Sequence, residues 1–277
     1  MNSGFELVHL KSGQHSVRCR THGETMHIGS GPGTEAVELY VRQQRIVERA
    51  QAHAGTGTPF VIWDVGLGPA GNALTAIDAL RGVVAQVEIH SFEIDTAVLE
   101  FALQHAEALG YLAGWEPVIE RLLAEGVAQP LPQVRWQLHR GDYLGQLQNA
   151  PPPAAIFHDP YSPARNPGMW SLEVFRAARE RAGECECLLT NYTRSTAVRV
   201  TLALAGWAVG FGVPTGDKDQ TTTAATRLDL LERPLDRAWL RRVRASTNAA
   251  PFLGGQYAPG PISEADFAAL EALPQFA

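Results

Sequence analysis

The feature that most constrains this fold is a regular alternation of strand-like and helix-like segments that begins near residue 59. Short β-rich runs stand at residues 60–65, 87–93, 134–139, 154–159 and 187–192. Helical stretches stand at residues 71–82, 95–110, 171–183 and 195–206. Because this order joins parallel strands through right-handed helical crossovers, it predicts an α/β fold with a doubly wound, mostly parallel sheet.

The segments that flank this alternation predict additions to one large domain. Loose alternation around Lys11–Gln14 predicts a short β-hairpin, and residues 34–54 have near-helical spacing, with Thr34 as the expected N-cap. The expected organisation is an N-terminal extension of hairpin plus helix packed on the main domain (1–55), a main domain (56–235) and a C-terminal helix and tail (236–277).

Composition and charge narrow the class of protein. No apolar run reaches the roughly 18 to 20 residues that cross a bilayer, and the N-terminus lacks the basic-then-apolar order of a signal peptide. We therefore expect a cytoplasmic protein without a membrane partner. The three cysteines are too sparse for a disulfide framework and too weakly patterned for a metal site, which predicts buried structural thiols and no metal: Cys19, Cys185 and Cys187.

The formal net charge of -6 gives no basic field over the whole protein. A nucleic-acid partner would therefore have to meet a local basic patch. One cluster of arginines falls in a predicted helix late in the chain, although a solvated helix face is the commoner meaning of such a cluster: Arg233, Arg237, Arg241, Arg242 and Arg244.

Ligands of doubly wound sheets bind beyond the carboxyl ends of the strands, so the residues after each strand are the most informative. After the first run, Asp64 precedes Gly66, Gly68 and Gly71, which are spaced GxGxxG where a helix begins. Glycines let the backbone turn sharply and approach a nucleotide-like ligand. Glu93 ends the next run, 22 residues after Gly71, where an acid takes both hydroxyls of a ribose.

These two features fit an NAD-dependent oxidoreductase as well as an S-adenosylmethionine-dependent methyltransferase. The later strand ends favour the methyltransferase. Asp142 after the third run suits an adenine amino group, and Asp159-Pro160-Tyr161 after the fourth suits a reacting amine beside a sulfonium. An NAD enzyme needs a substrate domain, whereas the residues after Asp159 continue the αβ alternation. We therefore expect S-adenosylmethionine as the cofactor.

A specific resemblance rests on residues 157–170, which read Phe-His-Asp-Pro-Tyr-Ser-Pro-Ala-Arg-Asn-Pro-Gly-Met-Trp. This stretch resembles the motif of the methyltransferase domain of the MnmC family and its stand-alone relatives. There an Asp and an aromatic residue precede a Pro, a basic residue, Asn-Pro and Trp. The resemblance covers about residues 5–232, and its other matches are Glu24 to His27, Glu35-Ala36, Tyr40-Val41, Gly66-Leu67-Gly68, Asn72-Ala73, Ser91-Phe92-Glu93 and Gly141-Asp142.

The resemblance implies a Rossmann-like methyltransferase that acts on tRNA. The family methylates the exocyclic amine of 5-aminomethyl-2-thiouridine at the wobble position of the anticodon. MnmC itself carries an additional FAD-dependent oxidase domain. This chain looks like the single-domain form without that oxidase.

Roles for individual residues follow from these matches and from the chemistry. Asp159 and Tyr161 are the expected catalytic residues: Asp159 holds the amine and accepts its proton, while Tyr161 packs against the substrate. The neighbouring prolines fix this corner of the backbone. The expected cofactor-binding residues are Asp64, Gly66, Gly68, Gly71, Asn72, Glu93, Asp142 and His158. The expected substrate-binding residues are Glu24, His27, Pro163, Asn166, Trp170, Tyr192 and Arg194.

Several of these residues have a plain structural alternative. Asp159 and Asp142 also suit capping of the turn or helix that follows, and such a role is compatible with ligand binding. His158 has the more common alternative of a satisfied histidine at a strand end, and Trp170 that of a core residue. Tyr192 and Arg194 suit base stacking and a phosphate contact, or an ordinary loop.

The chain departs from the family pattern at three places. The family's third glycine falls at Ala70, with Gly71 displaced by one, and Pro160 stands where the family usually has a small residue. A basic Gly-Arg-Lys-Arg-like run appears here with Asp217 and Asp219 in place of arginines. This last departure bears on the tRNA contact. A small-molecule amine N-methyltransferase is therefore the first alternative, followed by an NAD-dependent oxidoreductase and a non-catalytic nucleotide-binding module.

Overall fold

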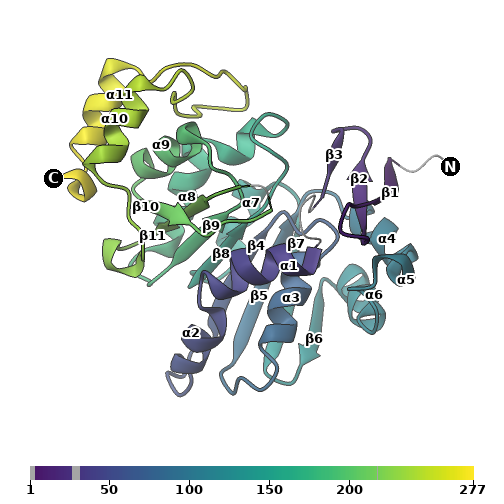
Figure 1. Cartoon of the computed structure of the whole chain (residues 1–277). Coiled ribbons are helices and arrows are strands. Elements are labelled where there is room, and N and C mark those ends of the chain that lie inside the picture. The colour runs from purple at the N-terminus through teal and green to yellow at the C-terminus, as the bar shows by residue number, and fades with distance from the viewer. Residues whose placement is uncertain (1–3, 27–31, 217) are drawn as a thin grey trace.

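The structure is a computed structural model that describes residues 4–26, 32–216 and 218–277. Its centre is an eight-stranded sheet (Figure 1) in the order β10 (Ala208–Gly212), β11 (Thr221–Ala225), β9 (Leu188–Asn191), β8 (Ala155–His158), β4 (Phe60–Val65), β5 (Val87–Glu93), β7 (Val134–Arg140) and β6 (Val127–Leu131). Strands β9, β8, β4, β5 and β7 pair in parallel. The antiparallel pairings lie toward the two edges. The predicted doubly wound, mostly parallel α/β fold is confirmed.

Helices cover both faces of this sheet, and strand β4 shows how the sequence separates the two cores. Phe60 and Ile62 pack into one core, whereas Val61, Trp63 and Val65 pack into the other. The first core contains α3 (Gly71–Ala79), α4 (Ala97–Gln104), α5 (Ala106–Leu109) and α6 (Glu116–Glu125). The second contains α7 (Tyr143–Gln146), α8 (Leu172–Ala182), α9 (Thr196–Leu204), α10 (Arg237–Ala245) and α11 (Glu264–Glu271). Because alternate strand residues face opposite sides, a continuous apolar run serves both cores.

Short 3-10 turns join several of these elements. They are η2 (Leu147–Asn149), η3 (Pro167–Trp170), η4 (Leu228–Leu230) and η5 (Pro274–Phe276). Among the residues that the structure describes, no helix has the length and apolar character needed to cross a membrane.

The N-terminus forms a small sheet that stands beside α4 and α5, apart from the large sheet (Figure 1). Strands β1 (Phe5–His9) and β2 (His15–Cys19) form the predicted antiparallel hairpin. A third strand, β3 (Glu24–Thr25), pairs with β2. This small sheet brings residues from the first tenth of the chain to the carboxyl edge of the large sheet.

The helix expected after this sheet is broken into three pieces: α1 (Pro32–Ala36), a π-helical segment (Val37–Arg42) and α2 (Ile46–Ala52). Thr34 lies inside α1, so the prediction that it caps the helix is wrong. The break centres on Arg45, whose φ of 50° is left-handed. It sends two glutamine side chains into the sheet: Gln44 donates to the carbonyl of Ile156 at 2.9 Å, and Gln43 donates to the Thr190 hydroxyl at 3.2 Å.

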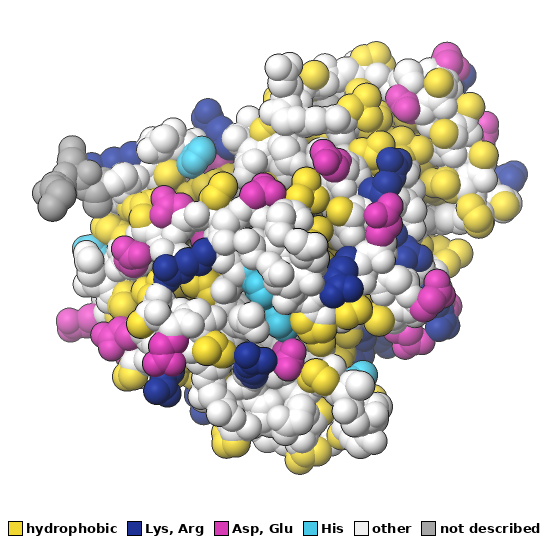
Figure 2. Space-filling model, turned by 180° about the vertical axis from the view of Figure 1, so that it is seen from behind, with side chains coloured by type: hydrophobic (Ala, Val, Ile, Leu, Met, Phe, Trp, Pro, Cys, Tyr) yellow, Lys and Arg dark blue, Asp and Glu magenta, His cyan; other side chains and the backbone are white. Residues whose placement is uncertain are grey.

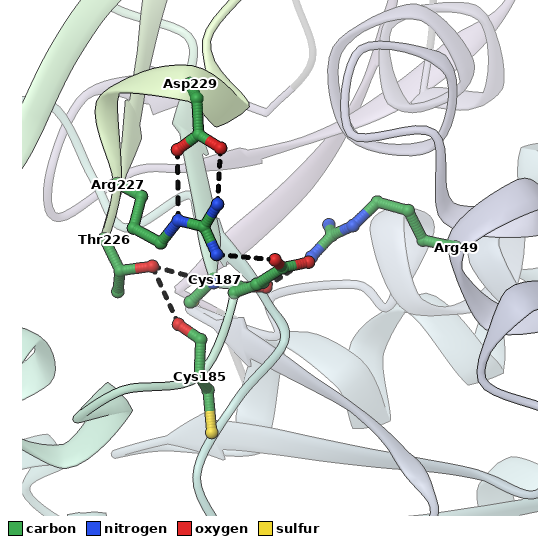
Figure 3. Close-up of polar contacts among 7 residues, drawn as sticks. Arg49, Cys185, Cys187, Thr226, Arg227 and Asp229 are labelled. Atoms are coloured by element: carbon green, nitrogen blue, oxygen red, sulfur yellow. Dashed lines mark hydrogen bonds and ion pairs between the residues drawn. The ribbon is translucent and has the colours of Figure 1, made fainter. Parts of the chain in front are cut away.

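The amino end of β9 is held by a separate polar cluster (Figure 3). Arg227 pairs with Asp229 and with Glu186, and Arg49 of α2 donates to the carbonyl of Glu186 at 2.6 Å. The Thr226 hydroxyl donates to the carbonyl of Cys185 and accepts from the amide of Cys187. Cys187 and Cys19 are buried as expected, but Cys185 is exposed, so that prediction is wrong for this residue. The cluster combines the ion pairs of Arg227 with hydrogen bonds to backbone groups, and it lies at the edge opposite the strand ends where ligands bind.

His158, the last residue of β8, is buried in the second core. Its ring lies 4.9 Å from the Trp170 ring and 5.0 Å from the Phe175 ring, centroid to centroid. Burial lowers the pKa of His158 to about 3. The folded protein therefore holds this histidine neutral, whereas the unfolded chain binds a proton below a pH of about 6.5.

We predict that His158→Phe makes the fold less sensitive to acid. A pKa below its unfolded value means that stability present above pH of about 6.5 is lost as the pH falls toward the folded value. Phenylalanine removes that loss. The difference in unfolding free energy between pH 7.5 and pH 5, measured by urea denaturation, should shrink by about 2 kcal/mol relative to the parent protein. An identical pH dependence in the two proteins would contradict the assignment of a neutral buried imidazole.

Candidate active site

A cavity of about 1190 Å³ opens at the carboxyl edge of the large sheet. The segments that follow β4, β5, β7, β8 and β9 line it, and the small N-terminal sheet closes one side. Doubly wound sheets bind ligands at this edge, beside the strand where the order reverses, which here is β4. The volume exceeds the roughly 300 to 1,000 Å³ of a usual small-ligand pocket, so a cofactor and part of a substrate fit together.

The structure brings most of the expected site residues together in this cavity. Those that line it are Glu24, Gly66, Gly68, Asn72, Glu93, Asp142, Asp159, Tyr161, Asn166 and Tyr192. Those that do not line it are Asp64, Gly71, His158, Pro163, Trp170 and Arg194. His27 lies outside the described residues.

The glycine loop after β4 forms the floor of the cavity. Gly66 has a φ of 85°, and a Cβ atom at this position would lie 2.9 Å from the carbonyl oxygen of Asp159. Gly68 is also left-handed. The third left-handed position is Ala70, with a φ of 65°, and Gly71 begins α3. The displaced glycine of the sequence is therefore not the residue that carries the strained backbone.

Glu93, at the end of β5, is fixed at the cavity rim by backbone amides. Its carboxylate accepts hydrogen bonds from Gly68 at 3.0 Å and from Ile94 at 2.9 Å. Burial raises the pKa of Glu93, and these amide donors oppose the rise. The bond to Gly68 joins the Glu93 carboxylate to the glycine loop. The residue expected to bind the ribose is therefore attached directly to the backbone expected to hold the cofactor.

Asp142 caps the helix that follows β7. Its carboxylate accepts from the amide of Gly145 at 3.1 Å, which gives it the structural role expected as one of two compatible roles. One side of the residue still lines the cavity. The geometry thus leaves the proposed adenine contact open to this side chain.

Asp64 lies beneath the loop rather than in the cavity wall. It is fully buried, and its carboxylate accepts from the Ser91 hydroxyl at 2.7 Å, which in turn accepts from the Trp136 indole at 2.8 Å. Burial raises the pKa of Asp64 to about 7, and the Ser91 bond opposes the rise. Asp64 therefore does not line the cavity, and a direct contact between its carboxylate and the cofactor stays a prediction.

Asp159 stands directly after β8, opposite the glycine loop. The Asn72 amide of α3 donates to its carboxylate at 2.6 Å. The Asn72 side chain is itself buried. Burial raises the pKa of Tyr40, and the charge of Asp159 raises it further. Asp159 is therefore oriented by an amide from the element that begins at the glycine loop.

The proline-rich corner after Asp159 is held by bonds to its backbone. Trp170 donates from its indole to the carbonyl of Tyr161 at 2.8 Å, and Tyr192 donates from its hydroxyl to the carbonyl of Pro160 at 3.1 Å. Trp170 is fully buried, so it supports the corner from the core and does not touch the cavity. The Tyr161 ring faces His22 of the small sheet at 4.4 Å between centroids.

Glu24 attaches the small N-terminal sheet to this corner. Its carboxylate accepts from the amide of Ser162 at 3.0 Å and from the Ser162 hydroxyl. The residue expected to bind substrate thus has a defined partner in the protein. Arg194, in contrast, is exposed and pairs with Asp219 at 3.3 Å, away from the cavity lining.

Sequence reasoning gave no site role to several residues that line the cavity or lie beside it: His22, Met26, Glu35, Tyr40 and Lys218. Glu35 and Tyr40 belong to matched pairs in the family resemblance, which was the one signal available for them. Lys218 is the central residue of the altered basic run. It carried no signal of its own, because the departure from the family pattern lies in the neighbouring acids. Among the described residues, no cluster of His, Cys, Asp or Glu has the arrangement needed to hold a metal ion.

Comparison with known proteins agrees with this geometry. A sequence model of a family described as S-adenosyl-L-methionine-dependent methyltransferase matches residues 119–227, which include Asp142 and the corner at Asp159. The crystal structure of MnmC2 from Aquifex aeolicus is 25% identical to the chain with a TM-score of 0.72, over 98% of this chain and 85% of that one. The chain is an S-adenosylmethionine-dependent methyltransferase, and it is similar to MnmC2 over nearly its whole length.

Other solved structures are more distant. Human methyltransferase-like protein 13 in complex with SAH is 15% identical with a TM-score of 0.42, over 73% of this chain and 86% of that one. Precorrin-6y C5,15-methyltransferase from Geobacter metallireducens is 16% identical with a TM-score of 0.39, over 66% of this chain and 89% of that one. No curated protein matches the chain in sequence. The cofactor of this methyltransferase is S-adenosylmethionine, and the glycine cradle, the Glu93 carboxylate and the cavity volume fit it.

We predict that Gly66→Ala damages the site more than Gly68→Ala. Both changes force alanine into a left-handed backbone, which costs about 1 kcal/mol. The new methyl group at position 66 meets backbone atoms, whereas the nearest atom at position 68 is the Met26 sulfur at 3.8 Å. Overpacking should cost Gly66→Ala a further 1 to 3 kcal/mol or so of unfolding free energy and weaken S-adenosylhomocysteine binding. Urea denaturation and calorimetry check this; equal losses in the two variants would contradict it.

Proposed function

We propose that this methyltransferase transfers a methyl group to the primary amine of 5-aminomethyl-2-thiouridine at the wobble position of tRNA, in the cytoplasm. The observation that carries the proposal is the Asp159 carboxylate, which lines the cavity opposite the glycine loop and is oriented by Asn72 at 2.6 Å. A carboxylate at this place suits a substrate that must be held as a cation and then lose a proton. The similarity to MnmC2 over nearly the whole chain supports tRNA as the carrier of that amine.

The chemistry requires the neutral amine. A primary alkylammonium has a pKa near that of lysine, about 10.4, so deprotonation at pH 7 costs about 4 to 5 kcal/mol. The cofactor supplies an electrophilic methyl group. The lone pair of the amine forms the new N–C bond while the electrons of the S–C bond return to sulfur, and the surplus proton on nitrogen leaves to a base.

Asp159 is the proposed base and the proposed anchor of the amine. Its carboxylate stands at the end of a parallel strand, and the Trp170 and Tyr192 bonds fix the peptides that follow it. Such preorganisation keeps a base within reach of the reacting nitrogen. Tyr161 is proposed to pack against the uracil ring and exclude water, with Asn166 on the same wall of the cavity.

The remaining cavity residues divide between the two ligands in this proposal. Gly66 and Gly68 approach the cofactor, Glu93 binds its ribose and Asp142 lies near its adenine. The Tyr192 ring lies on the substrate side, beside Asp159. Glu24 closes that side by its bonds to Ser162.

One observation favours a small-molecule amine as a second candidate substrate. The charged residues of the cavity wall are mostly acidic: Glu24, Glu35, Glu93, Asp95, Asp142, Asp159 and Glu173, against Arg18 and Lys218. On the face drawn in Figure 2, Lys and Arg side chains are scattered among Asp and Glu. An acidic wall attracts a small cation, whereas a polyanionic tRNA binds through basic surface.

The experiment that separates the two candidates measures transfer from labelled S-adenosylmethionine. The proposal expects label in tRNA that bears 5-aminomethyl-2-thiouridine and none in unmodified tRNA. Transfer to free primary amines with the tRNA inert would favour the second candidate. Failure with both substrates, with S-adenosylhomocysteine binding intact, would contradict amine methylation altogether.

We predict that Asp159→Asn abolishes turnover and leaves the cofactor site intact. The amide has nearly the same shape but is not a base, so kcat should fall by about 100-fold or more. S-adenosylhomocysteine affinity, measured by calorimetry, should stay close to that of the parent protein, because Glu93 and the glycine loop are unchanged. Turnover near the parent rate would remove Asp159 from the mechanism.

A further inference from the structure

The described charged residues of the altered basic run at 216–220 point to different surroundings in the structure. Asp219 is exposed and pairs with Arg194 at 3.3 Å. Lys218 lines the cavity and is partly buried. Asp217 lies outside the described residues. Of Lys218 and Asp219, only Lys218 therefore lines the site. Its charge, rather than that of Asp219, is the one that a bound substrate meets.

Lys218 is held in a fixed position by the wall of the cavity. Its ammonium donates to the carbonyl of Tyr192 at 2.9 Å and lies 4.7 Å from the centre of the Tyr192 ring. Its backbone exchanges hydrogen bonds with Thr215 at 2.9 and 3.1 Å. Tyr192 in turn bonds the carbonyl of Pro160, the residue after Asp159. A continuous set of contacts thus connects Lys218 to the corner that carries the proposed base.

The charges that face Lys218 come from three other segments. Glu35 of α1 accepts from the Thr215 hydroxyl at 3.4 Å, next to the turn that carries Lys218. Asp159 follows β8, and Arg194 follows β9. Burial lowers the pKa of Lys218, the charges of Glu35 and Asp159 raise it, and Arg194 lowers it further. Lys218 is the positive member of a partly buried group whose other members near the proposed amine site are carboxylates.

This arrangement addresses a conflict in the proposed reaction. Carboxylates attract an ammonium substrate, but they also stabilise its protonated form, which cannot accept a methyl group. A cation beside the bound amine acts in the opposite direction, as a neighbouring positive group does for a reactive lysine.

We infer that Lys218 is a positioning residue whose charge favours the neutral form of the amine bound beside Asp159. The inference rests on the proposed function, because it requires an amine substrate. The neutral amine then attacks the methyl carbon as the S–C bond breaks, and the proton released before transfer leaves to Asp159 or to water. Lys218 itself gains and loses nothing in the step.

The test is the pH dependence of kcat, which reports groups in the bound complex. The parent protein, Lys218→Gln and Lys218→Arg are compared from pH 6 to pH 10 with the amine substrate identified above. Glutamine keeps a donor for the Tyr192 carbonyl but removes the charge, whereas arginine keeps the charge. Asp219→Asn, at the exposed neighbouring position, is the matched control. Lys218→Met provides a second neutral variant, and the thermal midpoint of each protein is measured with S-adenosylhomocysteine.

We expect Lys218→Gln to move the rising limb of kcat upward by about one pH unit, since the loss of one neighbouring unit charge changes a pKa by that order. Its kcat should fall about tenfold at pH 7 and approach the parent value at pH 10. Lys218→Arg and Asp219→Asn should keep the parent midpoint. Equal loss at every pH, or an unmoved midpoint in folded neutral variants, would overturn the inference while amine methylation stands. A parent protein inactive on every amine would overturn both.

Discussion

The site depends on the close approach of two neighbouring strand ends, β4 and β8. The backbone at Gly66 lies so near the peptide after Asp159 that even a methyl group does not fit between them. Parallel pairing sets this distance. Val65 and His158 are the last partners in the ladder, so Gly66 and Asp159 follow side by side at the same edge of the sheet. The loop proposed to hold the cofactor and the residue proposed to hold the amine are therefore fixed by one sheet register. Asn72 adds a direct bond between them.

The small N-terminal sheet completes what the large sheet leaves open. Besides packing beside α4 and α5, it contacts the corner after Asp159: Glu24 bonds Ser162, and His22 packs on Tyr161. These residues stand more than a hundred positions apart in the sequence. The corner is thus held from the core by Trp170, from β9 by Tyr192 and from the N-terminus by Glu24. Three independent supports explain how a short segment with three prolines keeps one conformation while facing a cavity.

The sequence predicted the parts of the site that local physics determines. The strand–helix alternation predicted the sheet, and the residues after each strand pointed to Glu93 and Asp159 because carboxyl ends meet at one edge. It did not predict what depends on tertiary contact. Asp64 carries the same local signal as a ligand, yet it is buried beneath the cavity and accepts a hydrogen bond from Ser91 of the next strand. The break at Arg45 had no local sequence signal, and the glutamines beside it bond strands that are distant in the sequence.

The altered basic run shows why residue type alone misled at the cavity. Two acids in place of arginines suggest a changed charge at the substrate, but an exposed Asp219 paired with Arg194 is screened by water and contributes little. A charge matters to a bound ligand in proportion to its burial and proximity, and Lys218 is partly buried in the wall of the cavity. An acidic cavity wall that also holds Lys218 is suited to an amine substrate, which binds as a cation but must be neutral to accept the methyl group. Methylation of an amine at pH 7 thus depends on the charges in the wall of the cavity as well as on the proposed base, Asp159.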